Sequence, residues 1–280
     1  MSTSANTSAN TSAITSAPTT PLLQVNKLGK SFGGVKAVDG ISFELAAGEL
    51  LAMIGPNGAG KSTTFNMVNG QLQADQGSIL LNGQELVGQK SRTIWRLGVG
   101  RTFQIAETFA SLTVIENVQM ALLSHDGKLF SMWRRAAEYK RDDALNLLEQ
   151  VGMKAQADRP CHELAYGDVK RVELAIAVAN SPKLLLMDEP TAGMAQQERN
   201  ALMALTKQLV MDRGMAVLFT EHSMDVVFAY ADRMIVLARG RLIAQGNPHD
   251  IRHHPEVQEV YFGSGKTFEK SKIRLQGDAA

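Results

Sequence analysis

The chain has 280 residues, of which 44% are hydrophobic and 20% are charged, with a formal net charge of +1 at pH 7. This length suits one large domain or two modest ones, and the composition is ordinary for a soluble globular protein. The near-neutral charge argues against bulk electrostatic binding to nucleic acid or anionic lipid. Cys161 is the only cysteine, which excludes an internal disulfide.

The two ends of the chain have tail-like compositions. Residues 1–21 are mostly Ser, Thr, Ala and Asn, with too little apolar surface to fold, and residues 267–280 are polar. The N-terminus lacks the basic and apolar segments of a secretory signal, and the sequence has no run of 18 or more apolar residues. These features favour a cytoplasmic protein or a peripheral membrane subunit.

The ordered part of the chain begins near Leu22 with a strand-rich segment. Residues 22–32 and 41–45 alternate apolar and polar side chains, as antiparallel strands do. Residues 49–68, ELLAMIGPNGAGKSTTFNMV, predict a buried strand, a glycine-rich turn and a helix. We therefore expect a small antiparallel region beside a first strand–helix unit.

A helical segment follows, from about residue 109 to residue 152. Thr113 and Glu116 match the S/T-x-x-E capping box, which opens a helix through VIENVQMALL. Residues 138–153 place apolar side chains at helical spacing between charged flanks. The pattern predicts a block of helices inserted into the chain.

Strands and helices alternate in the last third of the chain. The predicted strands are residues 183–187, 216–220, 233–238 and 241–246. The predicted helices are residues 168–181, 195–212 and 223–231. This alternation predicts an α/β layer with a largely parallel sheet, to which the early strands and the central helices are additions.

The clearest motif is GPNGAGKST, residues 55–63, which matches G-x-x-x-x-G-K-[ST] between a predicted strand and a predicted helix. Its glycines permit a backbone curl whose N–H groups point at phosphate oxygens, and the helix adds its positive N-terminal end. Lys61 would neutralise the β and γ phosphates, and Ser62 would offer a hydroxyl to Mg²⁺. The alternative, a chance glycine turn, is disfavoured by the complete motif and its context.

A second motif, LLLMDEP, includes the predicted strand at residues 183–187. Asp188 follows at the C-terminal end of that strand, where ligands of parallel sheets bind, and would hold Mg²⁺ directly or through water. Glu189 is suited to orient or deprotonate a water molecule. The alternative for Glu189 is a helix-capping or surface carboxylate.

Together these motifs resemble the ATP-binding subunits of ABC transporters, over about residues 23–263. The matching segments, in order, are Phe32, the phosphate loop, RTFQ with Gln104, LAYGD, DEPTAGM, and TEHSMD with His222. The resemblance implies an α/β fold of the ABC ATPase type: a P-loop NTPase (RecA-like) core with an antiparallel β subdomain and an α-helical subdomain. It implies an ATP-binding domain at residues 22–266, with the helical subdomain at about residues 105–165.

The resemblance also assigns roles to residues that no local pattern identifies. Phe32 would stack on adenine, Gln104 would face Mg²⁺ and water, and His222 would contact the γ-phosphate. The expected catalytic residues are Glu189, His222 and Gln104, and the expected metal ligands are Ser62, Gln104 and Asp188. The expected nucleotide-binding residues are Phe32, Gly55, Asn57, Gly58, Ala59, Gly60, Lys61, Ser62, Thr63, Tyr166 and Gly167.

The segment LAYGD, residues 164–168, stands where the family's signature usually reads LSGGQ. Ala165 lacks the serine hydroxyl, a loss of roughly 0.5–1.5 kcal/mol, while Gly167 and its helix N-terminus remain. Asp168 either caps the helix, turned away from phosphate, or slows ATP hydrolysis at the opposite cassette. Ala195 stands where the family often has an aspartate.

The sequences LAYG, AGM after DEP, EHSMDVVFAYADRMIVLARGRLIAQG and VQEVYFG resemble cassettes of branched-chain amino-acid importers. This implies ATP and Mg²⁺ as cofactors, with two transmembrane permeases, a second cassette and, indirectly, an extracytoplasmic solute-binding protein as partners. The altered signature favours a heterodimer over a homodimer. We expect a peripheral subunit on the cytoplasmic side of the inner membrane that does not bind nucleic acid.

Three alternatives differ in substrate or class. The cassette could serve another small solute, such as urea, amides or aromatic compounds, or lipid export. An ABC ATPase of DNA repair or translation would carry long coiled coils or two cassettes, which this sequence lacks. A small-molecule kinase would not need Gln104, LAYGD and His222 at these spacings. ATPase activity that rises with membrane partners, and not with nucleic acid, would separate these classes.

Overall fold

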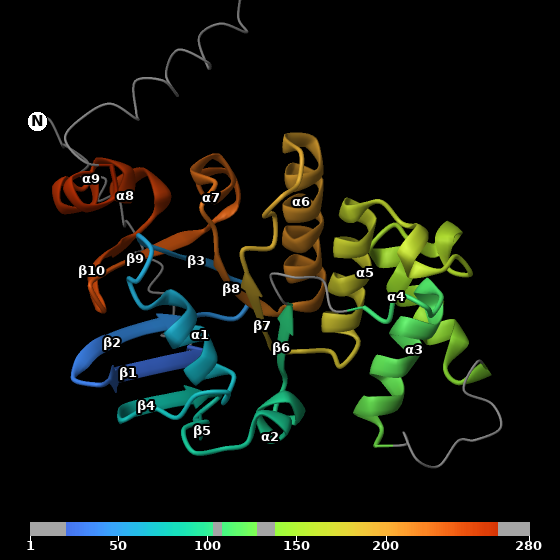
Figure 1. The fold of residues 1–280 in the computed structure, drawn as a ribbon, viewed down its shortest axis with the longest axis horizontal. Coiled ribbons are helices and arrows are strands. Elements are labelled where there is room, and N and C mark those ends of the chain that lie inside the picture. The colour runs from blue at the N-terminus through green and yellow to red at the C-terminus, as the bar shows by residue number, and fades with distance from the viewer. Residues whose placement is uncertain (1–20, 103–107, 128–137, 263–280) are drawn as a thin grey trace, which may run out of the picture.

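The computed structural model describes residues 21–102, 108–127 and 138–262. Gln104 and the two expected tails, apart from residue 21, lie outside these ranges. The described strands form a four-stranded sheet in the order β2-β1-β4-β5 and a six-stranded sheet in the order β10-β9-β3-β8-β7-β6. The ribbon in Figure 1 shows both sheets, with α3, α4, α5 and α6 to the right of them and α7, α8 and α9 above.

The smaller sheet is antiparallel throughout. Its strands are β1 (Leu23–Phe32), β2 (Val35–Leu45), β4 (Gln76–Leu81) and β5 (Gln84–Glu85). In β2 the side chains of Ile41, Phe43 and Leu45 are buried while those between them are exposed, because alternate residues of a strand point to opposite faces. The expected antiparallel pair β1–β2 is confirmed, whereas β4 and β5 were not predicted.

The larger sheet is parallel except at its β10 edge. Its strands are β3 (Leu50–Ile54), β6 (Val99–Thr102), β7 (Leu184–Asp188), β8 (Ala216–Thr220), β9 (Arg233–Ala238) and β10 (Arg241–Gly246). Every residue of β3 and β8 is buried, as expected of strands covered on both faces. Because β3, β7 and β8 are parallel neighbours, their C-terminal ends meet at one edge of the sheet.

Strand β3 separates two hydrophobic cores. Leu50, Ala52 and Ile54 belong to the core beneath the helices, and Leu51 and Met53 belong to the core shared with the antiparallel sheet. In Figure 1 the parallel sheet accordingly lies between α6 and α7 above and β1 and β2 below. The residues that follow β3, β7 and β8 are therefore held by strands anchored on both sides.

The helices around the parallel sheet largely follow the predicted pattern. They are α1 (Lys61–Val68), α2 (Ser91–Arg96), α5 (Tyr166–Val178), α6 (Gln196–Arg213), α7 (Met224–Tyr230), α8 (Pro248–His253) and α9 (Pro255–Phe262). Helix α5 begins two residues earlier than predicted, and α2, α8 and α9 were not predicted. No helix within the described ranges is long and apolar enough to span a bilayer.

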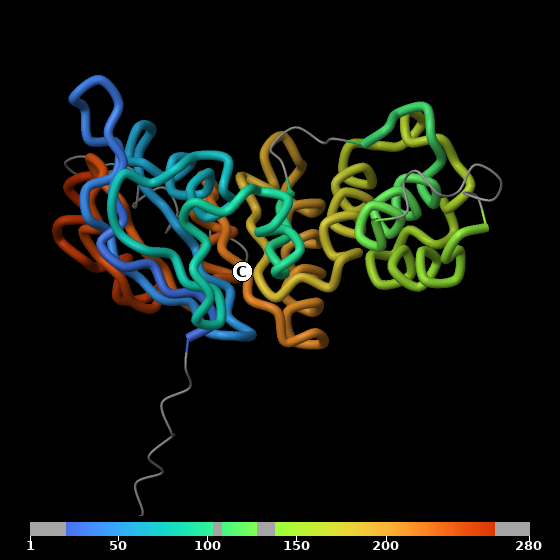
Figure 2. Tube along the Cα trace, turned by 90° about the horizontal axis from the view of Figure 1, so that it is seen from below, coloured from blue at the N-terminus to red at the C-terminus, as the bar shows by residue number. Residues whose placement is uncertain are grey.

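A separate helical part contains α3 (Val114–His125), α4 (Arg141–Gln150) and two short 3₁₀ turns, η2 (Lys154–Gln156) and η3 (Cys161–Glu163). The predicted capping box is confirmed, since Glu116 N–H donates to Thr113 Oγ1 and Thr113 N–H donates to a carboxylate oxygen of Glu116. Figures 1 and 2 both show α3 and α4 at the end of the molecule opposite β1 and β2.

The chain enters and leaves this helical part through two segments that lie side by side. Val114 N–H donates to the carbonyl oxygen of Arg159 at 2.9 Å, and Cys161 N–H donates to that of Leu112 at 3.0 Å. The helical part is therefore closed at its base, and α5 resumes the main layer directly after it.

Candidate functional site

The phosphate loop, residues 55–60, connects β3 to α1 and passes very close to two neighbouring strands. A Cβ atom at Gly55 would lie 2.2 Å from the carbonyl oxygen of Leu237 in β9, and one at Gly60 would lie 2.5 Å from that of Ala37 in β2. Gly60 also has φ of +102°, a conformation that glycine adopts without strain. These two glycines are required because the backbone itself fills the space that a side chain would need.

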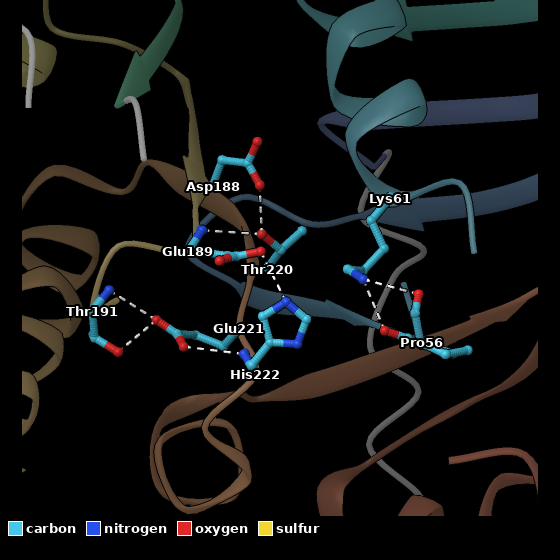
Figure 3. Close-up of polar contacts among 9 residues, drawn as sticks. Pro56, Lys61, Asp188, Glu189, Thr191, Thr220, Glu221 and His222 are labelled. Carbon is cyan, nitrogen blue, oxygen red and sulfur yellow. Dashed lines mark hydrogen bonds and ion pairs between the residues drawn. The ribbon is translucent and has the colours of Figure 1, made fainter. Parts of the chain in front are cut away.

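Lys61 is the first residue of α1, and its side chain is buried in the loop. Its ammonium donates to the carbonyl oxygens of Gly55 at 2.8 Å and Pro56 at 3.2 Å (Figure 3). Burial lowers the pKa of Lys61, and the nearby carboxylates of Glu189 and Asp188 act in the opposite direction. An ammonium held by carbonyl oxygens can exchange them for phosphate oxygens, which bind it more strongly because they are charged.

The other predicted loop residues differ in accessibility. Asn57, Gly58 and Ser62 are exposed, Thr63 is half-buried, and Ala59 is buried. No side chain caps the N-terminus of α1 at Gly60. The exposed Ser62 hydroxyl and the uncapped first turn are thus both accessible to an anion and its counter-ion.

Thr220, the last residue of β8, joins the two acidic residues of the DEP motif. Its hydroxyl donates to Asp188 Oδ1 at 2.8 Å and accepts from the N–H of Glu189 at 3.1 Å (Figure 3). Thr220 is fully buried, so its hydroxyl is shielded from water, while the two carboxylates it joins are partly exposed. Thr220 was not among the predicted site residues, although its position at the end of a predicted strand, two residues before His222, offered a signal.

Glu189 and His222 are in direct contact. His222 Nε2 lies 2.9 Å from Glu189 Oε1, with both side chains partly open to solvent (Figure 3). Glu189 has φ of +49°, a left-handed conformation that costs a non-glycine residue about 1–2 kcal/mol. The two hydrogen bonds from its N–H to Thr220, one to the hydroxyl and one to the carbonyl, help to hold this conformation. The site therefore presents a carboxylate and an imidazole together to solvent.

Glu221 provides a second link between the ends of β7 and β8, and it too was missed from the sequence. Its buried carboxylate accepts from the N–H of Thr191 at 2.9 Å and from the Thr191 hydroxyl at 2.6 Å. Its other oxygen accepts from the N–H of His222 at 3.2 Å. Glu221 thereby fixes the segment after DEP relative to the segment that carries His222.

Phe32 precedes the phosphate loop in the sequence, and Gln104 follows it. Phe32 ends β1 with its side chain 50% exposed, and the Lys30 ammonium lies 5.6 Å from its ring. Because β2 of the same hairpin contacts Gly60 through Ala37, this exposed ring belongs to the hairpin beside the phosphate loop. Gln104 lies outside the described residues, two positions after β6.

The signature segment forms the start of α5. Tyr166 is 45% exposed, and Gly167 is buried against Glu198, whose Oε1 would lie 2.9 Å from an added Cβ. Of the two alternatives for Asp168, the helix cap is not formed: Ala165 occupies the cap position, and the Asp168 carboxylate accepts from Gln156 Nε2 at 3.2 Å. The Asp168 carboxylate thus bonds to the side-chain amide of Gln156, in the helical part, and not to the N–H groups at the start of α5.

Helix α5 lies apart from α1 in both views of the molecule (Figures 1 and 2). The structure thus does not bring Tyr166 and Gly167 to the phosphate loop of their own chain. It does bring together Lys61, Asp188, Glu189 and His222, which come from the ends of two strands, β7 and β8, and from the start of helix α1 (Figure 3).

Comparison with known proteins identifies the family. The family described as ABC transporter matches residues 38–192. The high-affinity branched-chain amino acid transport ATP-binding protein LivG of Escherichia coli strain K12 is 39% identical over 250 residues, which cover 87% of this chain and 98% of LivG. The chain belongs to the ABC transporter ATP-binding family. The cassette is therefore an ATP-binding and ATP-hydrolysing subunit, which works within a transporter complex beside permeases and a paired cassette.

Further comparisons agree on fold and subfamily. The family described as branched-chain amino acid ATP-binding cassette transporter matches residues 241–267. BraF of Pseudomonas aeruginosa, a high-affinity branched-chain amino acid transport ATP-binding protein, is 36% identical over 250 residues, covering 87% of this chain and 98% of BraF. The ADP conformation of MJ1267, an ATP-binding cassette of an ABC transporter, superposes with a TM-score of 0.79 at 30% identity, covering 88% of this chain and 100% of that one. The expected fold class is confirmed.

Proposed function

We propose that the cassette hydrolyses ATP to energise the import of branched-chain or related amino acids. The observation that carries this proposal is the contact of His222 with Glu189 beside Asp188, in a chain 39% identical to LivG. The match of residues 241–267 to branched-chain amino acid cassettes supports the choice of substrate class. Hydrolysis would occur where the C-terminal ends of β3, β7 and β8 meet.

In this proposal the phosphate loop binds the phosphates, Asp188 serves the metal and Glu189 serves the water. Lys61 binds the β and γ phosphates together with the loop N–H groups. Ser62 and Asp188, with Gln104, would hold Mg²⁺, and hydroxyl and carboxylate oxygens are the ligands that this ion prefers. When bound, the ion neutralises charge on the phosphate oxygens.

The hydrolytic step follows from the Glu189–His222 contact. Glu189 orients a water molecule and accepts its proton as the water oxygen bonds to the γ-phosphorus and the bond to the β–γ bridging oxygen breaks, giving ADP and phosphate. His222 fixes the Glu189 carboxylate and contacts the γ-phosphate. The strained backbone at Glu189 is consistent with a position held for function.

The partners follow from the position of the signature. We propose that ATP lies between the phosphate loop of one cassette and Tyr166 and Gly167 of a second, with heterodimers favoured. The domain at residues 22–266, through its helical subdomain at about residues 105–165, would contact two permeases on the cytoplasmic side of the inner membrane. An extracytoplasmic solute-binding protein would deliver the amino acid.

Replacing Glu189 with Gln tests the catalytic assignment. Purified Glu189→Gln cassette should bind ATP normally and lose most of its ATPase activity, because the amide cannot accept the proton. Glu256→Gln removes one exposed carboxylate from α9 and should behave as wild type. Near-normal hydrolysis by Glu189→Gln would contradict the proposed role.

A transport assay tests the substrate. The cassette, reconstituted in proteoliposomes with its genetically adjacent permeases, second cassette and binding protein, should drive ATP-dependent uptake of leucine, isoleucine or valine. Uptake of urea or amides in place of these amino acids would assign the cassette to a different solute. Stimulation of its ATPase activity by DNA or RNA would contradict a transport role.

A further inference from the structure

Arg101 lies in β6, three residues before Gln104 in the segment RTFQ. Among the described strands of the larger sheet, β6 pairs only with β7, and Arg101 lies opposite Leu186. Its side chain is 10% exposed, so its charge is largely removed from water. A guanidinium in such a position requires partners, and those partners show what it does.

Among the contacts to described residues, the Arg101 guanidinium joins the end of β7 to α1 and the turn after it. Nη2 lies 3.5 Å from Oδ2 of Asp188, at the end of β7. Nη1 donates to Asn66 Oδ1 in α1 at 2.9 Å and to Gln71 Oε1 just after α1 at 2.8 Å. Arg101 thus links the carboxylate expected to hold Mg²⁺ to the helix that follows the phosphate loop.

We propose that Arg101 is a positioning residue that sets the orientation of the Asp188 carboxylate for metal binding. The proposal rests on the proposed Mg²⁺ role of Asp188. Thr220 donates to Oδ1 while Arg101 faces Oδ2, so both carboxylate oxygens are held from the protein side. An aspartate held in this way presents a fixed lone-pair direction to a metal and does not have to be ordered when the metal binds.

The guanidinium is suited to this task because its own position is fixed. The group is planar and carries donors in a rigid fork, and Asn66 and Gln71 hold one arm of that fork. Lysine has a single flexible ammonium, which can reach Asp188 or Asn66 but cannot reproduce the fork. Arg101→Lys should therefore restore the charge and only part of the geometry.

The size of the effect follows from the contact distance. Loss of a group that orients a metal ligand typically costs 10–100-fold in metal affinity. At 3.5 Å the Arg101–Asp188 contact is longer than a charge-assisted hydrogen bond, and Thr220 continues to hold the other oxygen. We therefore expect the lower end of that range, about tenfold.

The experiment measures binding of a fluorescent ATP analogue to the purified cassette across a Mg²⁺ titration and again in EDTA. Arg101→Gln should raise the Mg²⁺ concentration at half-saturation about tenfold, while affinity in EDTA stays within about twofold of wild type. The Mg²⁺ concentration at half-saturation of Arg101→Lys should lie between those of wild type and Arg101→Gln. Arg96→Gln, an equal charge change at an exposed position of α2, should match wild type.

Several outcomes would overturn the inference. An unchanged Mg²⁺ midpoint in Arg101→Gln would show that Arg101 does not position Asp188, and equal weakening with and without Mg²⁺ would show a purely structural role. If Arg101→Gln does not fold, Asn66→Ala and Gln71→Ala, which loosen the guanidinium, should each raise the midpoint several-fold, and no rise in either would overturn it. A wild-type cassette indifferent to Mg²⁺ would instead refute the proposed metal role of Asp188.

Discussion

His222 Nε2 lies 2.9 Å from Glu189 Oε1, and this contact connects the residues that follow two neighbouring strands, β7 and β8. Each side chain therefore limits where the other can go. Hydrogen bonds also join the two segments: Glu221 bonds to Thr191, and Thr220 bonds to Asp188 and Glu189. The pair behaves as one unit anchored to the sheet, which leads to a specific expectation for mutants.

We expect His222 and Glu189 to be strongly non-additive. His222→Ala should lower kcat about 100-fold, the lower range for loss of general acid–base function, because Glu189 is no longer oriented. Glu189→Gln combined with His222→Ala should be no slower than Glu189→Gln alone, since residues that act as a unit do not add. Steady-state ATPase assays measure this, with the exposed His249→Ala as control. If the two losses of kcat instead multiplied in the double variant, Glu189 and His222 would not act as one unit.

Thr220→Val should reduce both stability and turnover. Valine keeps the shape of threonine but leaves Asp188 Oδ1 without its donor, a loss of about 1–3 kcal/mol in the free energy of unfolding. We expect ATPase activity to fall roughly tenfold, because about 1.4 kcal/mol in the barrier corresponds to that factor. Thr220→Ser keeps the hydroxyl and should retain most activity. Wild-type turnover in Thr220→Val would refute the role of this hydroxyl.

Two glycines of the phosphate loop should respond differently to alanine. Gly58 has φ of +78° but open space around it, so Gly58→Ala should cost only the backbone strain, about 1–2 kcal/mol. Gly55→Ala would place a methyl group 2.2 Å from the Leu237 carbonyl oxygen, which adds about 1–3 kcal/mol of overpacking and displaces the loop. Urea unfolding and ATP binding measure both effects. If Gly55→Ala weakened folding and ATP binding no more than Gly58→Ala does, the loop would be able to move freely away from β9.

Acid should weaken the helical part through Asp126. The Lys140 ammonium, 2.8 Å away, and the Tyr139 hydroxyl, which donates to the same carboxylate, hold the pKa of Asp126 below its usual value. The folded state then binds fewer protons than the unfolded state, so this stabilisation is present above about pH 4 and is lost as the pH falls through the folded pKa.

Asp126→Asn should therefore be less stable at neutral pH and should lose less stability on acidification than wild type. Thermal unfolding at a series of pH values measures both changes. Asp158→Asn, which removes a largely exposed partner of Arg141, is the matched control and should follow the wild-type curve. If the unfolding temperatures of wild type and Asp126→Asn changed with pH in parallel, Asp126 would not be the group that makes stability depend on acid.

The features predicted correctly from the sequence are those with local causes. The turn between β3 and α1 was predicted from its own glycines and the apolar run before them, and the capping box of α3 needs only residues three apart. A buried strand such as β7 is predicted by its four consecutive apolar residues. In each case the sequence pattern and the physical requirement occupy the same few positions.

The features that were missed depend on contacts between distant segments. Strand β6 contains only four residues, two of them Gly100 and Arg101, and it becomes a strand because β7 offers a hydrogen-bonding edge. The hydrogen bond of Thr220 to Asp188 forms because β7 and β8 are adjacent, and the strand-end position of Thr220 alone does not identify that partner. Asp168 has the side chain of a helix cap, yet Gln156, in a separate 3₁₀ turn, attracts it instead.

The closed base of the helical part has a consequence for how such proteins can diversify. Hydrogen bonds between Leu112 and Cys161 and between Val114 and Arg159 bring its two ends together. Since the cost of closing a loop rises only slowly with its length, segments within that boundary can lengthen, shorten or be exchanged without moving the strands on either side. A chimaera carrying another transporter's insert between these bonds should therefore retain its ATP chemistry.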